Sequence, residues 1–217
     1  MSDDSKGRGV IRSVWVLTLV LLASCVTGCQ EGEEEIPTEE AQAVVQVAEP
    51  ASAELLRTLV GRLTAALEEG GAVGALDFCS TEALPLTRQV QAGLGGGLEV
   101  KRTSFRVRNP ANAPDQAEEE ALLHFEEAIG AGGPTPSSYV QRVSDAEYRY
   151  YKPLFVAEVC LQCHGAPEAL DPEVQTLLSE RYPEDLAAGY AVGDFRGVVR
   201  VSVPAEGLEA RPSEAGS

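Results

Sequence analysis

The chain has 217 residues, of which 44% are hydrophobic, so it is long enough for one domain of ordinary size with a buried core. Its 34 Asp and Glu residues outnumber its 17 Lys and Arg residues, which gives a formal net charge of −17. This charge argues against nucleic acid as a partner, keeps the protein soluble, and favours basic partner proteins.

Residues 1–28 have the pattern of a lipoprotein signal peptide. Three basic residues precede a short apolar run, 14–23, and small residues with two cysteines follow. A bilayer needs about 20 apolar residues, so this run indicates an export signal rather than a membrane span. The tetrapeptides that end at Cys25 and at Cys29 both resemble a lipobox, in which the cysteine becomes acylated. We expect Cys29 to carry the lipid, because cleavage before Cys25 would leave Cys29 without a role.

The rest of the chain divides into three parts. Residues 29–50 are rich in Glu and are expected to form an acidic tether, and residues 206–217 are expected to be a disordered tail. Residues 51–205 then form the folded domain. The protein is therefore expected on the periplasmic side of the cell membrane or outer membrane, with the lipid as its only membrane contact.

Apolar spacing and turn residues predict the elements of this domain. Asp115 and Glu118 form a capping box at the start of one helix, and Gly70 with Gly71 ends another. Helices are expected at 52–69, 72–91, 115–129 and 172–181, and strands at 98–108, within 139–156 and at 199–203. This order predicts an α+β fold with a mainly antiparallel sheet flanked by helices and preceded by an N-terminal helix.

Cys160, Cys163 and His164 form a Cys-x-x-Cys-His motif. In c-type haem attachment, two thiols at this spacing form thioethers with the haem vinyl groups, and the adjacent imidazole binds the iron. Haem is attached to c-type proteins outside the cytoplasm, which agrees with the export signal. The motif therefore predicts one covalent haem c, with His164 as an axial ligand.

Three other interpretations use the same cysteines. They are a thioredoxin-type dithiol, a structural disulfide, and a zinc site completed by Cys79 and His124. A dithiol enzyme would need a βαβ context and would not need His164. A zinc site would be unusual in an exported single domain.

The second axial ligand of the haem is open from the residues alone. The one methionine is Met1, which belongs to the leader, so His/Met ligation is excluded. Cys79 and His124 remain as donors. Cys79 is expected on the buried face of the second helix, where it is either a ligand or a small apolar residue. His124 shares a helix face with Phe125, which also suits a half-buried, hydrogen-bonded histidine.

Several stretches resemble a known family of single-haem c-type proteins with a PAS-like fold, first met as a domain of unknown function and typified by a cyanobacterial Tll-type haem protein. The resemblance covers about residues 51 to 205. Its main stretches are 74–79, 101–104, 108–115, 160–165, 189–190 and 193–197. It implies a PAS-like sheet flanked by helices, haem on Cys160 and Cys163, and His164 and Cys79 as the two axial ligands.

Arg102, Arg106 and Arg108 alternate along the strand expected at 98–108, so they would share one basic face. They are candidates for contacts to haem propionates. Ordinary ion pairs or a solvated strand face explain the same pattern.

Electron transfer with other exported redox proteins is the function we expect from a lipid-anchored, cytochrome-like c-type haem domain. The alternative is a haem-based redox or gas sensor that acts through a separate partner, because the sequence contains no output domain. Catalysis is not expected, since a peroxidase-like site would need an open iron position and a distal acid or base. The sequence does not identify the redox partner protein.

Overall fold

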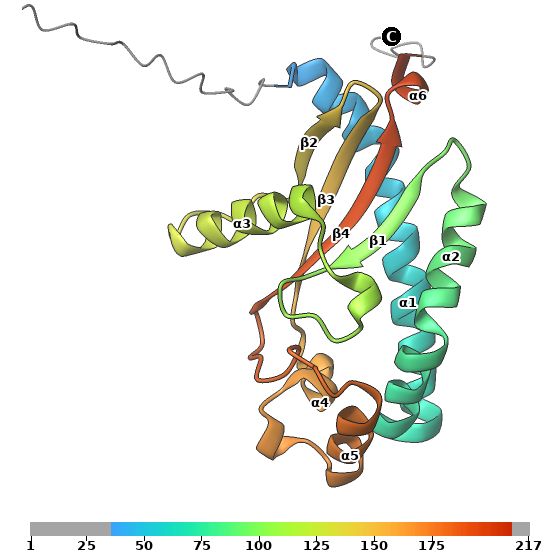
Figure 1. The fold of residues 1–217 in the computed structure, drawn as a ribbon, viewed down its shortest axis with the longest axis vertical. Coiled ribbons are helices and arrows are strands. Elements are labelled where there is room, and N and C mark those ends of the chain that lie inside the picture. The colour runs from blue at the N-terminus through green and yellow to red at the C-terminus, as the bar shows by residue number, and fades with distance from the viewer. Residues whose placement is uncertain (1–35, 210–217) are drawn as a thin grey trace, which may run out of the picture. The chain divides into compact units, whose positions relative to one another are not determined.

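The computed structural model describes residues 36–209, and the signal peptide with Cys25 and Cys29 lies outside this range. The predicted α+β class is confirmed, with helices on both faces of an antiparallel sheet (Figure 1). The elements are α1 (Thr38–Thr81), α2 (Ala83–Leu94), β1 (Glu99–Thr103), α3 (Gln116–Gly130), β2 (Tyr139–Ser144), β3 (Glu147–Phe155), α4 (Leu161–His164), α5 (Pro172–Arg181), β4 (Phe195–Pro204) and α6 (Glu206–Glu209). None of these described helices is long and apolar enough to span a bilayer.

The sheet has four strands in the order β1-β4-β3-β2, and each neighbouring pair is antiparallel. Alternate residues of a strand face opposite sides, so β4 contributes to two separate cores. Val199 and Val201 pack with α1, whereas Val198 packs with Tyr151 and with Phe125 of α3. The sheet is therefore covered by α1 and α2 on one face and by α3 on the other.

Helix α1 begins well before the predicted domain boundary. Val44 and Ala48 are fully buried in the main core, and the Tyr148 hydroxyl donates to Glu40 at 2.6 Å. The prediction of a tether over 29–50 is thus wrong from Thr38 onward. The acidic residues obscured an apolar repeat that continues into the helix expected at 52–69.

Gly71 reverses the direction of the chain within α1. Its φ of 60° and ψ of −156° are not helical, and only glycine adopts this conformation without strain. Arg62 and Glu82 form an ion pair at 3.0 Å, although a straight helix would separate them by roughly 30 Å. The predicted helix end at Gly70–Gly71 is confirmed, and residues 72–81 form a second arm that packs against the first.

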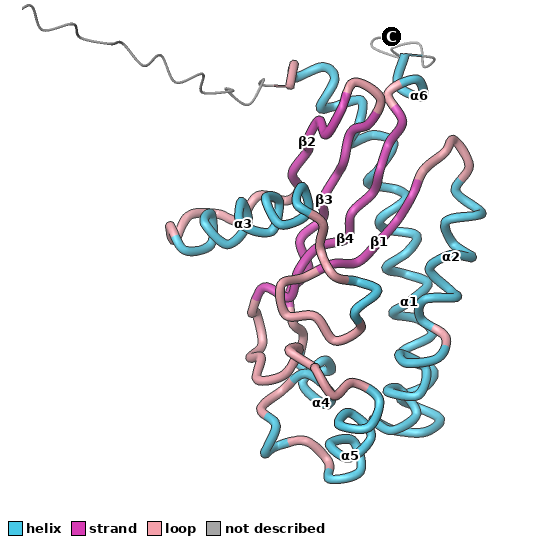
Figure 2. Tube along the Cα trace, viewed as in Figure 1, coloured by secondary structure: helices cyan, strands magenta, loops and turns pink. Residues whose placement is uncertain are grey.

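Strand β1 is shorter than predicted. It ends at Thr103, and the chain then continues through a loop and a short helical turn, Pro110–Asn112 (Figure 2). The Ser104 hydroxyl accepts a hydrogen bond from the Arg106 backbone N–H at 3.1 Å, which replaces sheet pairing with a local turn. Arg106 and Arg108 therefore do not share the strand face of Arg102.

The ends of two other helices test local predictions. Asp115 caps α3, and the reciprocal bond from its backbone N–H to Glu118 completes the predicted capping box. The C-terminal prediction is wrong at residues 206–209, which form α6, while residues 210–217 lie outside the described range.

Candidate functional site

The Cys-x-x-Cys-His motif folds into one compact helical turn. A short helical turn, Glu158–Cys160, leads directly into α4 and places Cys160, Cys163 and His164 at positions i, i+3 and i+4. Residues at this spacing lie on one side of a helical turn, and all three line a cavity of about 240 Å³. A Cβ at Gly165 would lie 2.6 Å from the Leu161 carbonyl oxygen, so glycine lets the chain leave the turn at once.

His164 is held by one ring nitrogen. Its Nδ1 lies 2.7 Å from the Ala187 carbonyl oxygen, which assigns the proton to Nδ1 and leaves Nε2 as an acceptor. Burial, together with the charges of Arg108 and Arg196, lowers the pKa of His164 to about 3. The ring is therefore a neutral imidazole, which is the form that binds metal ions.

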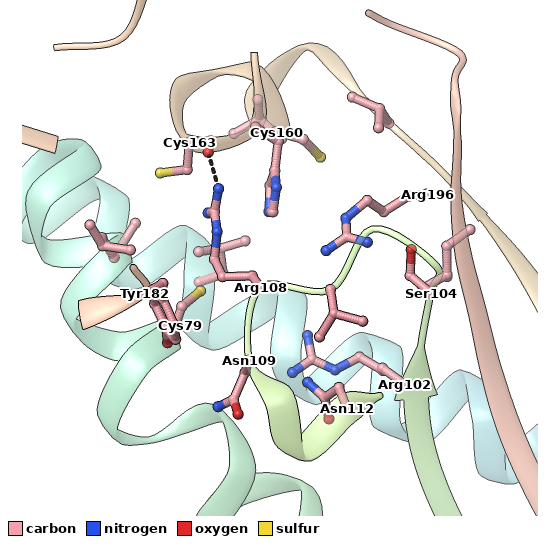
Figure 3. Close-up of a pocket in the computed structure, with 18 of the residues that line it drawn as sticks. Cys79, Arg102, Ser104, Arg108, Asn109, Asn112, Cys160, Cys163, Tyr182 and Arg196 are labelled. Carbon is pink, nitrogen blue, oxygen red and sulfur yellow. Dashed lines mark hydrogen bonds between the residues drawn. The ribbon is translucent and has the colours of Figure 1, made fainter. Parts of the chain in front are cut away.

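Arg108 fixes the turn to the segment that holds His164. Its guanidinium donates to the Cys163 carbonyl oxygen at 2.7 Å (Figure 3) and to the Ala187 carbonyl oxygen at 3.1 Å. It also pairs with Asp185 at 2.9 Å, and Asp185 accepts from the Ala187 backbone N–H at 2.8 Å. Arg108 thus positions two features of the site. One is the helical turn of residues 158–164, called the thiol turn below, and the other is the Ala187 carbonyl that orients His164.

Arg106 anchors the same segment from outside the cavity. Its Nε donates to the Leu186 carbonyl oxygen at 3.1 Å, a second donor reaches the Ala188 carbonyl, and the guanidinium lies 3.8 Å from the centre of the Tyr190 ring. The Gly189 backbone N–H in turn donates to the Gly165 carbonyl at 2.7 Å. Arg106 does not line the cavity, so the structure does not support it as a ligand contact.

Cys79 reaches the cavity from the second arm of α1, after the reversal at Gly71 (Figure 3). Burial raises the pKa of the Cys79 thiol, and the charges of Arg102 and Arg108 oppose that rise. Cys79, Cys160 and Cys163 are free thiols, so the disulfide interpretation is not supported by the described residues. Sequence positions 79 and 160–164 are therefore brought together at one cavity.

The rest of the cavity lining is apolar except for arginines, Tyr182 and small polar side chains. Arg102, Arg108 and Arg196 are the charged residues among those that line it, and Arg196 was missed by the sequence analysis. The apolar part consists of Leu63, Leu67, Ala75, Leu76, Val107, Leu154, Phe155, Val156 and Val159. Such a cavity suits a flat apolar ligand that also carries negative charge.

His124 is not part of this site. It lies exposed on α3, where its ring stacks on Tyr139 with a centroid distance of 4.1 Å. Within residues 36–209 no group of three or more His, Cys, Asp or Glu side chains is arranged to hold a metal ion. The zinc interpretation and the assignment of His124 as an axial ligand are therefore not supported.

The fold and the site together define an α+β domain whose Cys-x-x-Cys-His turn faces a largely apolar cavity. The family model described as Tll0287-like matches residues 30–204, and the chain belongs to this family. The crystal structure of the cyanobacterial heme-protein Tll0287 is similar to this chain, with a TM-score of 0.52 and 26% sequence identity over 78% of this chain and 97% of that one. No curated protein matches. The family resemblance seen in the sequence is thus confirmed.

Proposed function

We propose that this protein binds one haem c, attached covalently through Cys160 and Cys163 and bound axially by His164 and Cys79. The observation that carries the proposal is the bond from His164 Nδ1 to the Ala187 carbonyl oxygen, because it leaves Nε2 beside two thiols in the same cavity. The similarity to a cyanobacterial heme-protein supports the same ligand. When bound, haem supplies a one-electron iron couple.

Each group of residues has a separate task in this proposal. Cys160 and Cys163 hold the ligand by thioether bonds, and His164 offers a neutral nitrogen whose orientation is fixed. Cys79 offers sulfur from a different element, the second arm of α1. The apolar side chains of the lining lower the polarity around this donor set, which strengthens its electrostatic interactions.

We propose electron transfer as the role of the bound haem. Phe155 and Val159 line the cavity, yet they remain 45% and 46% exposed. They give the cavity an apolar rim where a partner protein can approach. With His164 and Cys79 both bound, the iron would offer no position to a substrate, and this is why we propose a role without catalysis. Sensing is the second candidate, and it requires that CO or NO displace Cys79.

We further propose that the chain is exported and lipid-anchored through Cys29, or through Cys25. The support is the signal-peptide pattern of residues 1–28. Metabolic labelling with a radioactive fatty acid checks this proposal, because the label should be lost in the variant of the acylated cysteine.

The first experiment is the absorption spectrum of protein exported in cells that mature c-type haem, before and after dithionite and CO. Haem should remain with the protein after acid-acetone extraction and should become extractable when both thioether bonds are removed, in the Cys160→Ala/Cys163→Ala double variant. Cys79→Ala should change the ferric spectrum, whereas His124→Ala is the matched control and should not. A colourless protein contradicts the haem proposal, and CO binding to the wild type favours sensing over electron transfer.

A further inference from the structure

The cavity is positively charged in a strongly acidic protein. The chain has twice as many acidic as basic residues, 34 against 17, yet three arginines and no Asp, Glu or Lys line the cavity. Carboxylates are available elsewhere in the fold for arginine pairs, as Arg149 with Asp115 and Glu147 shows. The lining itself therefore supplies no carboxylate to its arginines, and Asp185, which pairs with Arg108, lies outside it.

The three cavity arginines differ in what they already bind. Arg108 pairs with Asp185, which itself lies outside the lining. Arg102 forms no hydrogen bond or ion pair with any residue in 36–209. Arg196 donates to the Arg106 carbonyl oxygen at 3.2 Å and also interacts with the Tyr190 side chain and, at longer range, with the charge of Asp185. Arg102 and Arg196 thus retain guanidinium donors without a carboxylate partner.

The positive charges of Arg102 and Arg196 lie in an environment that disfavours them. Burial lowers the pKa of Arg102 and of Arg196, and the charge of Arg196 further lowers the pKa of Arg102. Two guanidinium groups that repel each other at largely buried positions cost free energy, which a carboxylate ligand would offset.

The two side chains also point to a common region. Arg102 lies on β1 and Arg196 near the start of β4, which is the strand paired with β1. Figure 3 shows both guanidinium groups extending from the sheet side into the cavity, while Cys160 and Cys163 come from the α4 turn. Arg102 and Arg196 therefore enter the cavity from different elements than Cys160 and Cys163, the two cysteines of the motif.

We propose that Arg102 and Arg196 bind the two carboxylates of the cavity ligand, which are the propionates of the haem. This inference rests on the proposed function and extends it to Arg196, which lies in the matching stretch 193–197 but was not among the candidate site residues. It also divides the four arginines of the region by role, since Arg106 and Arg108 use their donors to hold the 185–190 segment. Guanidinium groups bind carboxylates well because their planar donors match both oxygens.

The test compares Arg102→Leu, Arg196→Leu and Arg102→Lys with Arg88→Leu in the exported holoprotein. Arg88 lies exposed on α2 outside the cavity, so its variant removes the same charge elsewhere. Redox titration gives the reduction potential, and resonance Raman spectra report the propionate bending modes. We expect both cavity leucine variants to lower the potential and shift a propionate mode, because an unpaired propionate favours ferric iron.

Arg102→Lys keeps the charge and should retain most of the potential while still shifting the propionate mode. Covalent haem should remain in every variant, since Cys160 and Cys163 are intact. Cavity variants that match Arg88→Leu in both readouts overturn this inference and leave the proposed function standing. Wild-type protein without haem overturns both. If a leucine variant does not fold, Arg102→Lys and Arg196→Lys replace it. A shifted propionate mode in these lysine variants supports the inference, and an unchanged mode overturns it.

Discussion

Two charged regions of this molecule are built in opposite ways. On the α3 side of the sheet, each cation has a carboxylate partner. Lys101 and Arg200 contact Glu118 at 2.5 Å and 3.1 Å, and Arg149 contacts Asp115 at 2.8 Å. In the cavity, Arg102 and Arg196 contact no carboxylate among the described residues. Charges that are paired within the chain hold its elements together, whereas charges left unpaired in a cavity indicate a ligand.

Glu118 is the centre of the paired region and should give the largest effect on stability. Its side chain is fully buried and accepts from Lys101, from Arg200 and from the Asp115 backbone N–H. Glu118→Ala should lower the free energy of unfolding by about 3 kcal/mol, because two cations lose their partner. Urea unfolding followed by circular dichroism measures this loss.

Glu119→Ala is the control for that variant, because Glu119 is exposed on the same helix and should change stability by less than about 0.5 kcal/mol. Equal losses of stability in Glu118→Ala and Glu119→Ala would mean that the ion pairs of Glu118 with Lys101 and Arg200 do not hold α3 against the sheet.

Arg108 lines the cavity, but like the cations beside α3 it has a carboxylate partner, Asp185. It therefore tests whether a paired cation in the cavity also holds the fold together. The side chains of Arg108 and Asp185 are only 10% and 12% exposed, and Arg108 also donates to two carbonyl oxygens. Arg108→Leu should cost about 2–3 kcal/mol and reduce the yield of covalent haem, because the Cys163 and Ala187 carbonyls lose their donor. Thermal unfolding and haem absorbance per protein check both effects.

Asp185→Asn should lower the free energy of unfolding by less than Arg108→Leu does. In the Asp185 variant, Arg108 still donates to the Cys163 and Ala187 carbonyl oxygens. Wild-type haem yield in Arg108→Leu would show that this arginine does not position the turn.

Acid should weaken the α3 region. Burial alone would raise the pKa of Asp115 and of Glu147, but hydrogen bonds, including those from Arg149, lower both below their usual values. A lowered folded pKa stabilises the fold above the unfolded value of about 4, and this contribution disappears as the pH falls through the folded pKa. We expect less than about 1 kcal/mol for each group, since both partly face solvent.

Urea unfolding at several pH values between 6 and 2 measures this contribution, and Arg149→Leu should flatten the dependence. The same slope in both proteins would contradict a role for Arg149 in lowering these pKa values.

The smallest effect is expected at the reversal of α1. Arg62 and Glu82 pair at 3.0 Å, but their side chains are 58% and 56% exposed. Arg62→Ala should therefore cost no more than about 0.5 kcal/mol by urea unfolding. A loss above about 1 kcal/mol would show that this pair, rather than Gly71, fixes the reversal.

Local features were predictable from the sequence. The thiol turn, the capping box at Asp115 and the helix end at Gly71 each depend on residues within a few positions of one another. The buried repeat of Val44 and Ala48 was also visible, but the neighbouring glutamates favoured a tether. The predicted start of the folded domain was therefore wrong because the acidic residues were given more importance than the apolar repeat.

Nonlocal features were not predictable. The sequence does not show that Arg196 lines the cavity, because this depends on how β4 is placed in the fold. It also does not show whether a carboxylate of the chain pairs with it. The separation of Arg102 from Arg106 and Arg108 depends on where β1 loses its partner, after Thr103. The residues alone left both His124 and Cys79 as donors, and the family resemblance favoured Cys79, which the fold places at the cavity while His124 lies elsewhere.

The position of β4 bears on the order in which the cavity forms. β4 is the last strand in the chain, yet it lies between β1 and β3 in the sheet. Strand β1, with Arg102, therefore has no neighbour in the sheet until residues 195–204 arrive. The helical turn of residues 158–164 precedes β4 in the chain, and its backbone hydrogen bonds join residues only a few positions apart, which assemble faster than distant contacts. We therefore expect this turn to form before β4 completes the cavity wall on the β1 side.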